Sequence, residues 1–235
     1  MTDHRIVSRE EWLAARTSLL AEEKAFTHAR DALSQRRREM PWVKVDKPYR
    51  FVGADGSMSL ADLFGGKRQL IVYHFMYAPD WEKPCKSCSF WADGFNGIVA
   101  HLAQRDTALV AVSRAPLAKL EARKQRMGWT FPWVSSGDGD FNYDFGVSFR
   151  NEDLEAGTAT YNYAPKQGMM TDLPGVSGFI SEDDGAIYHT YSCFARGLDL
   201  LNPAYNYLDI TALGRHEEDL PFSMSWVKLR DEYVA

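Results

Sequence analysis

The sequence predicts an α/β fold with a central mixed sheet and flanking helices, and three observations support it. Two continuous apolar runs, 69–76 and 107–112, have the length and composition of buried strands. A helix-length segment, 85–104, separates them, which indicates a right-handed βαβ unit with parallel strands. Residues 176–193 form a predicted hairpin around the turn at 182–185, so an antiparallel pair completes the sheet.

The first 40 residues predict a separate helical arm. Apolar side chains recur at helical spacing through 9–39, and charged residues occupy most other positions. The basic end of this segment suits a helix C-terminus, and Pro41 ends the pattern. We therefore divide the chain into an N-terminal helical arm at 1–40 and a main domain at 41–235. The apolar stripe of so long a helix must cover either the main domain or a second subunit, so a homo-oligomer formed through this helix is one expectation.

The main domain contains a regular series of elements followed by an irregular region. Residues 137–175 lack periodicity, and a segment of that length is often functional or packs on itself. A closing helix is expected at 225–233. The elements before the irregular region are a hairpin at 49–60, a helical turn at 61–64 closed by glycines, the strand at 69–76, the helix at 85–104, the strand at 107–112, a helix from Pro116 to Met127 ended by Gly128, and a strand at 131–134.

Composition indicates an ordinary globular chain. With 235 residues, 45% of them hydrophobic and 25% charged, the length suits one domain with additions or at most two. The net charge of −5 and the lack of a basic stripe argue against a nucleic-acid partner. Every apolar run is far shorter than the roughly 20 residues needed to span a bilayer, so no membrane partner is expected. Three cysteines and no export signal predict a cytoplasmic protein without a structural disulfide framework.

The most informative motif is Cys85-Lys86-Ser87-Cys88, which follows the first buried strand and opens the next helix. A cysteine in the first turn of a helix lies near unsatisfied backbone N–H groups and the positive end of the helix dipole, which favour the thiolate. The second cysteine lies on a neighbouring part of the surface and can attack a mixed disulfide. Cys85 is therefore the predicted nucleophile, and Cys88, on the apolar face of the helix, is the predicted resolving thiol.

Four other residues are candidates for a supporting role. Trp81 can shield the dithiol, Pro84 precedes the nucleophile, and Arg114 at the carboxyl edge of the sheet can support a thiolate by its charge. The structural alternatives are a packed tryptophan and a surface arginine. His74 lies inside the first buried strand, where it is expected as a hydrogen-bonded core histidine or as a base near the cysteine loop.

Cys193, the third cysteine, is expected to be a buried strand residue rather than a third redox partner. A tetrahedral zinc site needs four ligands, and His189 and Cys193, predicted on one face of the terminal hairpin, are the only plausible additions to the dithiol. Nothing in the sequence brings them to the cysteine helix. We therefore predict neither a metal nor a cofactor.

The predicted order of hairpin, strand, cysteine helix, strand, helix, strand and terminal hairpin resembles the thioredoxin fold in its peroxiredoxin-type version. More narrowly, the chain resembles the DUF899 group of bacterial thioredoxin-like proteins, whose members are often labelled dithiol–disulfide oxidoreductases. Residues 77–85, with an aromatic residue, a proline and an Asp-aromatic pair before Cys85, resemble the loop before the peroxidatic cysteine of peroxiredoxins. The segments that carry the DUF899 resemblance are 11–16, 60–64, 69–76, 85–95, 175–179 and 196–199.

Three functional hypotheses follow from the motif and the resemblance. The first is an enzyme, a thiol–disulfide oxidoreductase in which Cys85 attacks and Cys88 resolves, acting on a disulfide-containing protein or a small thiol substrate. The second is a peroxiredoxin-like thiol peroxidase with Cys85 as the peroxidatic residue. The third is a non-catalytic oligomeric scaffold on a thioredoxin-like fold.

Overall fold

The structure is a computed structural model that describes residues 4–233. It contains two compact units that divide between Pro41 and Trp42. The N-terminal unit holds one long helix, α1 (Arg9–Arg38), which confirms the predicted helix. Ser8 and Glu11 form a capping box at its start, in which each side chain accepts a hydrogen bond from the other residue's backbone N–H. The helix buries none of its own side chains.

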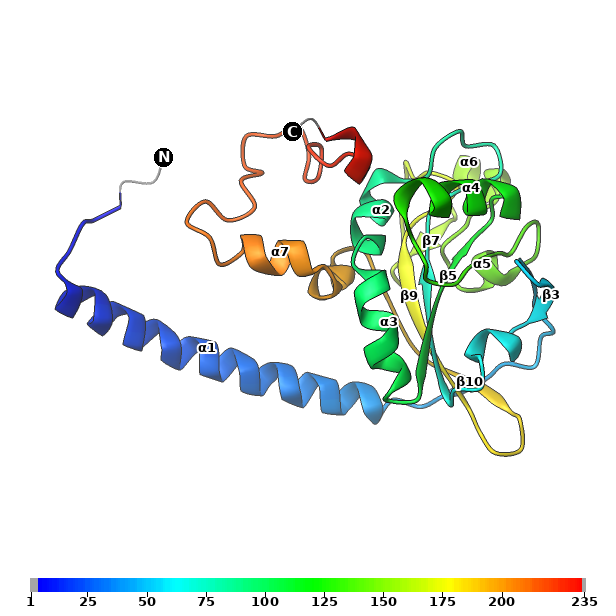
Figure 1. Cartoon of the computed structure of the whole chain (residues 1–235), viewed down its shortest axis with the longest axis horizontal. Helices are drawn as coiled ribbons and strands as arrows, with labels where there is room; N and C mark the ends of the chain where they lie inside the picture. The colour runs from blue at the N-terminus through cyan, green and yellow to red at the C-terminus, as the bar shows by residue number, and fades with distance from the viewer. Residues whose placement is uncertain (1–3, 234–235) are drawn as a thin grey trace. The chain divides into compact units, whose positions relative to one another are not determined.

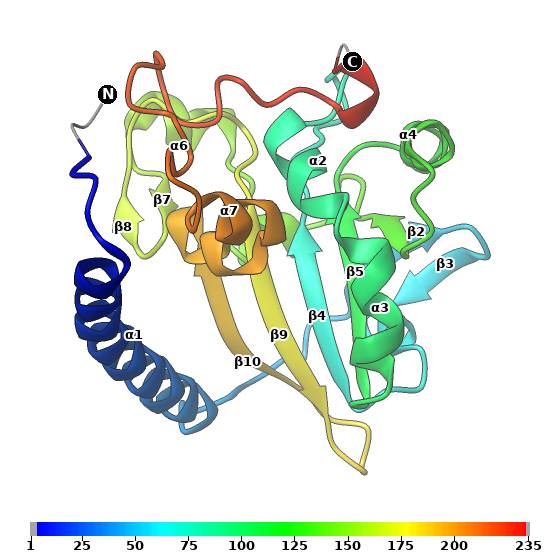
Figure 2. The same cartoon turned by 60° about the vertical axis from the view of Figure 1, so that its left-hand side comes forward.

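The second unit is built on an eight-stranded mixed sheet with the order β1-β10-β9-β4-β5-β6-β2-β3. Figure 2 shows its central strands β10, β9, β4 and β5 side by side. The continuous apolar runs form its centre, because strands buried on both faces need apolar side chains at every position. The strands are β1 (Val43–Lys44), β2 (Arg50–Gly53), β3 (Gly56–Ser59), β4 (Gln69–His74), β5 (Thr107–Ser113), β6 (Trp133–Ser135), β9 (Gly175–Ser181) and β10 (Ile187–Phe194).

The central strands have the arrangement of the thioredoxin fold. β4 pairs with β5 in parallel, and the segment between them crosses one face of the sheet as α2 (Lys86–Ala92) and α3 (Phe95–Ala103). On its other side β4 pairs with β9 antiparallel, and β9 pairs with β10 antiparallel. A βαβ unit next to an antiparallel hairpin, with two cysteines after the first strand, confirms the predicted thioredoxin-like α/β fold.

The helix predicted over 85–104 is two helices, and a tertiary contact explains the break. The Asp93 carboxylate accepts a hydrogen bond from Trp129 Nε1 at 2.8 Å, so the chain at this point is held by a residue from another element. The N–H of Gly94 bonds to the Trp91 carbonyl at 3.1 Å, which closes the first helix with a tight turn. Phe95 then begins α3. The single-helix prediction was therefore wrong at Asp93 and Gly94.

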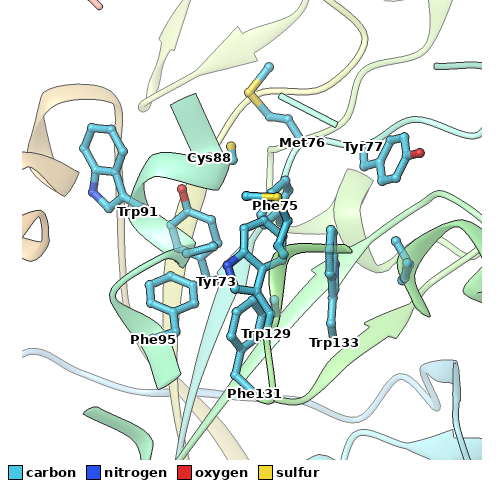
Figure 3. Packing of buried hydrophobic residues seen from close by; sticks show 14 of the residues in the cluster. Tyr73, Phe75, Met76, Tyr77, Cys88, Trp91, Phe95, Trp129, Phe131 and Trp133 are labelled. Carbon is cyan, nitrogen blue, oxygen red and sulfur yellow. The ribbon is translucent and has the colours of Figure 1, made fainter. Parts of the chain in front are cut away.

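Helices α2 and α3 lie along one face of the sheet (Figure 1). Two apolar clusters cover the two faces of the sheet. Alternate side chains of β4 enter opposite clusters, so Tyr73 packs under α2 and α3 while Val72 packs on the other face. The cluster under the helices includes Tyr73, Phe75, Cys88, Trp91, Phe95, Trp129, Phe131 and Trp133 (Figure 3). The cysteine helix is thus fixed against the sheet by aromatic packing.

The later parts of the chain differ more from the predictions. Helix α4 (Leu117–Met127) ends at Gly128 in the left-handed conformation, as predicted. The closing helix at 225–233 is wrong, because buried Val227 and Leu229 alternate with exposed neighbours in extended chain, and only η3 (Arg230–Glu232) is helical. The irregular region forms a small apolar cluster together with Phe194 of β10. The remaining elements are η1 (Asp62–Phe64), α5 (Phe141–Asp144), α6 (Asn151–Ala156), β7 (Thr160–Tyr161), β8 (Ala164–Pro165), η2 (Ala195–Leu201) and α7 (Pro203–Leu208).

Of the helices in residues 4–233, none combines the length and apolar character that crossing a membrane requires.

Candidate dithiol site

Cys85 is the N-cap residue of α2, at the carboxyl end of the central strand β4. Its backbone N–H bonds to the Met76 carbonyl at 3.1 Å, which ties the loop after β4 to the start of the helix. Its sulfur accepts a hydrogen bond from the Cys88 backbone N–H, with Sγ and N separated by 3.4 Å. Because the side chain is partly exposed, the sulfur meets both the helix amides and an approaching substrate.

These contacts lower the pKa of Cys85 to about 7. The largest cause is a hydrogen bond from the Cys88 side chain, and the backbone N–H groups of Cys88 and Ser87 add to it, while burial of the sulfur acts in the opposite direction. A thiol with this pKa is about half ionised at pH 7, whereas an ordinary cysteine is only a few per cent ionised. Cys85 therefore has the character of a nucleophile at neutral pH.

Cys88 has the opposite environment. Its side chain is 1% exposed and belongs to the apolar cluster between α2 and the sheet. Burial raises the pKa of this thiol well above its ordinary value, and its hydrogen bond to Cys85 adds to the increase. The two sulfurs are thus in contact but differ in acidity. Cys85 is the more exposed and the more acidic of the two, and Cys88 is buried in the core.

Tyr73 is a third member of the site that the sequence analysis missed. Tyr73 lies beneath α2 near Cys88 (Figure 3). Burial raises the pKa of this tyrosine well above its ordinary value, and its charge interaction and hydrogen bond with Cys88 add to the increase. Both side chains are fully buried, so the hydroxyl has its partner inside the core. A tyrosine within a buried strand needs a hydrogen-bond partner, and this was the available signal.

On the hypothesis of disulfide exchange at Cys85 and Cys88, we expect Tyr73→Phe to slow the second step of the reaction. Without the hydroxyl, the Cys88 thiolate loses a hydrogen bond of the kind worth about 1.5–3 kcal/mol to a charged group, so attack of Cys88 on a mixed disulfide should be about 10- to 100-fold slower. The first attack by Cys85 should be unchanged. Single-turnover kinetics with mass detection of the mixed disulfide measures both steps, and an unchanged second step would contradict this role.

A cavity of about 210 Å³ opens beside the two cysteines. Its wall is mostly apolar, formed by Tyr73, Trp91, Leu198 and Met224, with Arg196 and Asp199 also on its lining. Trp91 is held in this wall by a hydrogen bond from its indole Nε1 to the Leu198 carbonyl at 2.9 Å. The cavity is therefore built jointly by the cysteine helix, the central sheet and the C-terminal third of the chain.

Tyr161, from the irregular region, fixes the far wall of this cavity. Its hydroxyl donates to the Pro174 carbonyl at 2.7 Å and accepts from the Ala195 N–H at 2.9 Å. Ala195 has a φ of 49°, a left-handed conformation that a non-glycine residue holds only when its surroundings require it. Pro174 and Ala195 both line the cavity, so one buried hydroxyl positions two segments of its wall.

Two of the four predicted supporting residues lie in the cysteine loop. Pro84 is buried directly before Cys85. Trp81 is partly buried against the cluster that contains the dithiol. Its carbonyl accepts a hydrogen bond from Lys119 Nζ at 2.9 Å, which links the loop to α4. Both residues are thus placed to shape the loop.

His74 is not brought to the dithiol. Successive side chains of a strand point to opposite faces of the sheet. The His74 imidazole stacks on Phe145, on the face opposite to α2 and α3. Its Nε2 is 2.8 Å from the Ser177 hydroxyl, the hydroxyls of Ser177 and Ser192 are 2.8 Å apart, and Ser192 contacts His189 Nε2 at 2.7 Å. Burial lowers the pKa of His74 to about 3, so this is the neutral, hydrogen-bonded core histidine that the sequence allowed.

Arg114 forms an ion pair with Asp172. Its guanidinium makes two hydrogen bonds to the Asp172 carboxylate, at 2.9 and 2.6 Å, and a third to the Tyr143 hydroxyl at 2.8 Å. The Asp172 hydrogen bonds raise the pKa of Arg114 above its ordinary value. Both members of the pair are largely buried, with 11% and 4% of their side-chain surfaces exposed. Arg114 therefore anchors the irregular region to the end of β5 rather than standing free beside a thiolate.

Cys193 and His189 do not share a face, contrary to the prediction. A bulge shifts the register of β10 between His189 and Tyr191, so side chains beyond it exchange faces. Cys193 consequently packs against the cluster that contains Cys88, while His189 bonds to Ser192 on the other face. Cys193 lies in a strand as predicted, but it is only partly buried, so the prediction of a buried cysteine was wrong. Within residues 4–233, no group of three or more histidine, cysteine or carboxylate side chains could hold a metal ion.

The chain matches one protein-family model and is similar to several solved structures. The model of a family described as bacterial protein of unknown function (DUF899) matches residues 1–233. A solved structure of peroxidoxin BcpB from Mycobacterium tuberculosis is 14% identical, with a TM-score of 0.46 over 67% of this chain and 86% of that chain. Peroxiredoxin Q from Xanthomonas campestris is 18% identical, with a TM-score of 0.45 over 66% of this chain and 87% of that chain. No curated protein matches the chain.

Proposed function

The chain belongs to the DUF899 family, and we propose that it is a thiol–disulfide oxidoreductase whose dithiol is Cys85 and Cys88. The observation that carries the proposal is the contrast between two touching sulfurs. One is partly exposed, with a pKa lowered to about 7, and the other is buried, with a raised pKa. An acidic nucleophile with a buried neighbour is the pairing that two-step disulfide exchange requires.

The reaction proceeds in two balanced steps. The Cys85 thiolate attacks one sulfur of the substrate disulfide, the substrate S–S bond breaks, and one substrate thiolate leaves and takes a proton from water. Cys88 then loses its proton and attacks the Cys85 sulfur of the mixed disulfide, releasing the second thiolate. The substrate disulfide is reduced to two thiols, and Cys85 and Cys88 are oxidised to a disulfide. A dithiol reductant supplied from outside returns them to the reduced form.

The ionisation of Cys85 gives a direct test. We expect the rate of its alkylation by iodoacetamide to be half-maximal near pH 7, because the thiolate is lost as the pH falls through the lowered pKa. A free cysteine reaches half its maximal rate near pH 8.5. Mass spectrometry of the peptide that contains Cys85 in the folded chain measures the rate, with the same chain in urea as the control. A midpoint near that of free cysteine in the folded chain would remove the basis of the proposal.

Peroxide reduction by Cys85 is the second candidate, since a partly exposed thiolate can also attack a peroxide bond. One observation ranks it below disulfide exchange. The cation that could have assisted it, Arg114, is bound to Asp172. Stopped-flow reaction with hydrogen peroxide separates the two candidates, because only a peroxidase reacts much faster than free cysteine. A scaffold role without catalysis is the third candidate, and it would leave both assays negative.

A further inference from the structure

The size and lining of the cavity beside the dithiol indicate the kind of substrate that the site accepts. We propose that it binds the apolar substituent of a small, uncharged disulfide and so selects such molecules over charged or protein disulfides. This inference rests on the proposed function, because it names the substrate of the same dithiol. Its basis is the position, size, polarity and rigidity of the cavity.

The cavity lies directly beside the two cysteines. Cys85 and Cys88 both form part of the cavity wall, so a group that fills the cavity lies next to the attacking sulfur. Thiol–disulfide exchange needs the attacked sulfur in contact with Cys85. The substituent on that sulfur, only a bond or two away, then falls within the cavity. Binding energy gained there holds the reacting sulfurs together, which raises the rate of the first step.

Size limits what can enter. At about 210 Å³ the cavity is smaller than the roughly 300–1,000 Å³ of sites that enclose a whole drug-sized ligand. It is larger than the engineered cavity of about 150 Å³ that holds a benzene molecule. One alkyl chain or one ring therefore fits, whereas a peptide strand or a tripeptide disulfide would leave most of its bulk outside.

Polarity excludes charged groups. The deep wall is formed by Tyr73, Trp91 and Leu198, and the Tyr73 hydroxyl is already bonded to Cys88. The lining has one cation and one anion, Arg196 and Asp199, which bond to each other at 3.1 Å at the solvent-exposed rim, where the Arg196 side chain is 86% exposed. Asp199 is shared with Arg215 at 2.8 Å. A charged substituent within the apolar part of the cavity would lose water and find no counter-charge there, while an apolar one gains from burial.

Rigidity allows the cavity to discriminate. Its walls are held by two buried hydrogen-bonded groups, the Tyr161 hydroxyl on Pro174 and Ala195 and the Trp91 indole on the Leu198 carbonyl. A wall fixed in this way keeps its shape when a substrate is absent. Little ordering is then needed on binding, and differences between substituents appear in the rate.

The test compares two disulfides of nearly equal shape. Reduced full-length chain is mixed with dipropyl disulfide or with bis(2-hydroxyethyl) disulfide, in which each terminal methyl is replaced by a hydroxyl. The second-order rate constant for loss of protein thiols is divided by that for free dithiothreitol with the same disulfide, which removes intrinsic reactivity. We expect this normalised constant to be at least about 10-fold higher for dipropyl disulfide, since burying a hydroxyl in an apolar cavity is unfavourable. Glutathione disulfide and insulin should react more slowly than dipropyl disulfide on the same scale.

Three variants test whether the cavity causes this preference. Leu198→Phe should fill the cavity and bring the ratio of the two normalised constants close to one, whereas Leu200→Phe, on an exposed side of the same η2 segment, should keep the wild-type ratio. Met224→Gln, which changes polarity at nearly constant volume, should also lower the ratio and serves if Leu198→Phe does not fold. A wild-type ratio near one, or faster reaction with glutathione disulfide or insulin, overturns the cavity proposal and leaves the proposed function standing. No reaction with any disulfide overturns both.

Discussion

Cys85→Ser is expected to abolish catalysed disulfide reduction, with a loss of at least about 1,000-fold. A serine hydroxyl is not ionised at neutral pH and cannot form the mixed disulfide, so neither step of the exchange takes place. Reduction of dipropyl disulfide and of insulin, each with dithiothreitol as electron donor, measures the activity, with the rate of dithiothreitol alone as the reference. The variant should give the rate of dithiothreitol alone. Wild-type turnover by Cys85→Ser would eliminate the proposed function.

Two matched serine variants make this result specific. Cys88→Ser should keep the first attack and lose the second, so a mixed disulfide at Cys85 accumulates and turnover falls. Cys193→Ser should keep turnover close to wild type, because Cys193 does not belong to the proposed dithiol. Far-ultraviolet circular dichroism of all three variants checks that the fold is retained. Equal losses in all three would indicate general damage rather than the role of one nucleophile.

Asp172→Ala is expected to destabilise the fold by about 3–5 kcal/mol. The substitution leaves the Arg114 guanidinium largely buried without its carboxylate, and an uncompensated buried charge is among the costliest changes a core can undergo. The hydroxyls of Ser148 and Thr171, which also donate to Asp172 at 2.7 and 3.0 Å, lose their acceptor as well. Urea unfolding followed by tryptophan fluorescence measures the change in the free energy of unfolding.

The exposed pair of Lys44 and Asp46 provides the control. Its side chains are 56% and 74% exposed, so water screens the charges and Asp46→Ala should leave the unfolding midpoint unchanged. A second variant, Arg114→Met with Asp172→Leu, removes both charges and should recover much of the lost stability. A small loss for Asp172→Ala, similar to that for Asp46→Ala, would contradict the structural role of the Arg114–Asp172 pair.

The parts of the site that the sequence could indicate are those coded by neighbouring residues. The motif Cys85-Lys86-Ser87-Cys88 after an apolar run places two thiols at the start of a helix, and the structure has Cys85 as the N-cap of α2. The glycine that ends α4, Gly128, and the hairpin of β9 and β10 are local signals of the same kind.

The closing helix and the break within 85–104 show where local signals fail. Trp129 holds Asp93 across the core, and burial of Val227 and Leu229 favours extended chain over a helix. In both places a contact with a distant residue outweighs helix propensity, which contributes only tenths of a kcal/mol per residue. Helix propensity is a property of each residue type, whereas these contacts depend on which distant residues the fold places next to it.

Sequence alone therefore determined the fold class, the βαβ order and the position of Cys85 and Cys88 at the start of a helix. The spacing of apolar residues and the preferences at a helix start both act over a few neighbouring residues. Tertiary structure decided the rest. It places the Tyr73 hydroxyl beside Cys88, and it pairs Arg114 with the Asp172 carboxylate, 58 residues away in the sequence. It also brings the Tyr161 hydroxyl to Pro174 and Ala195, which line the cavity beside the dithiol. The bulge in β10 separated His189 from Cys193 by one change of register. Such partners are chosen by packing in three dimensions, where the strongest interaction of a buried polar group is with whichever residue the fold places beside it.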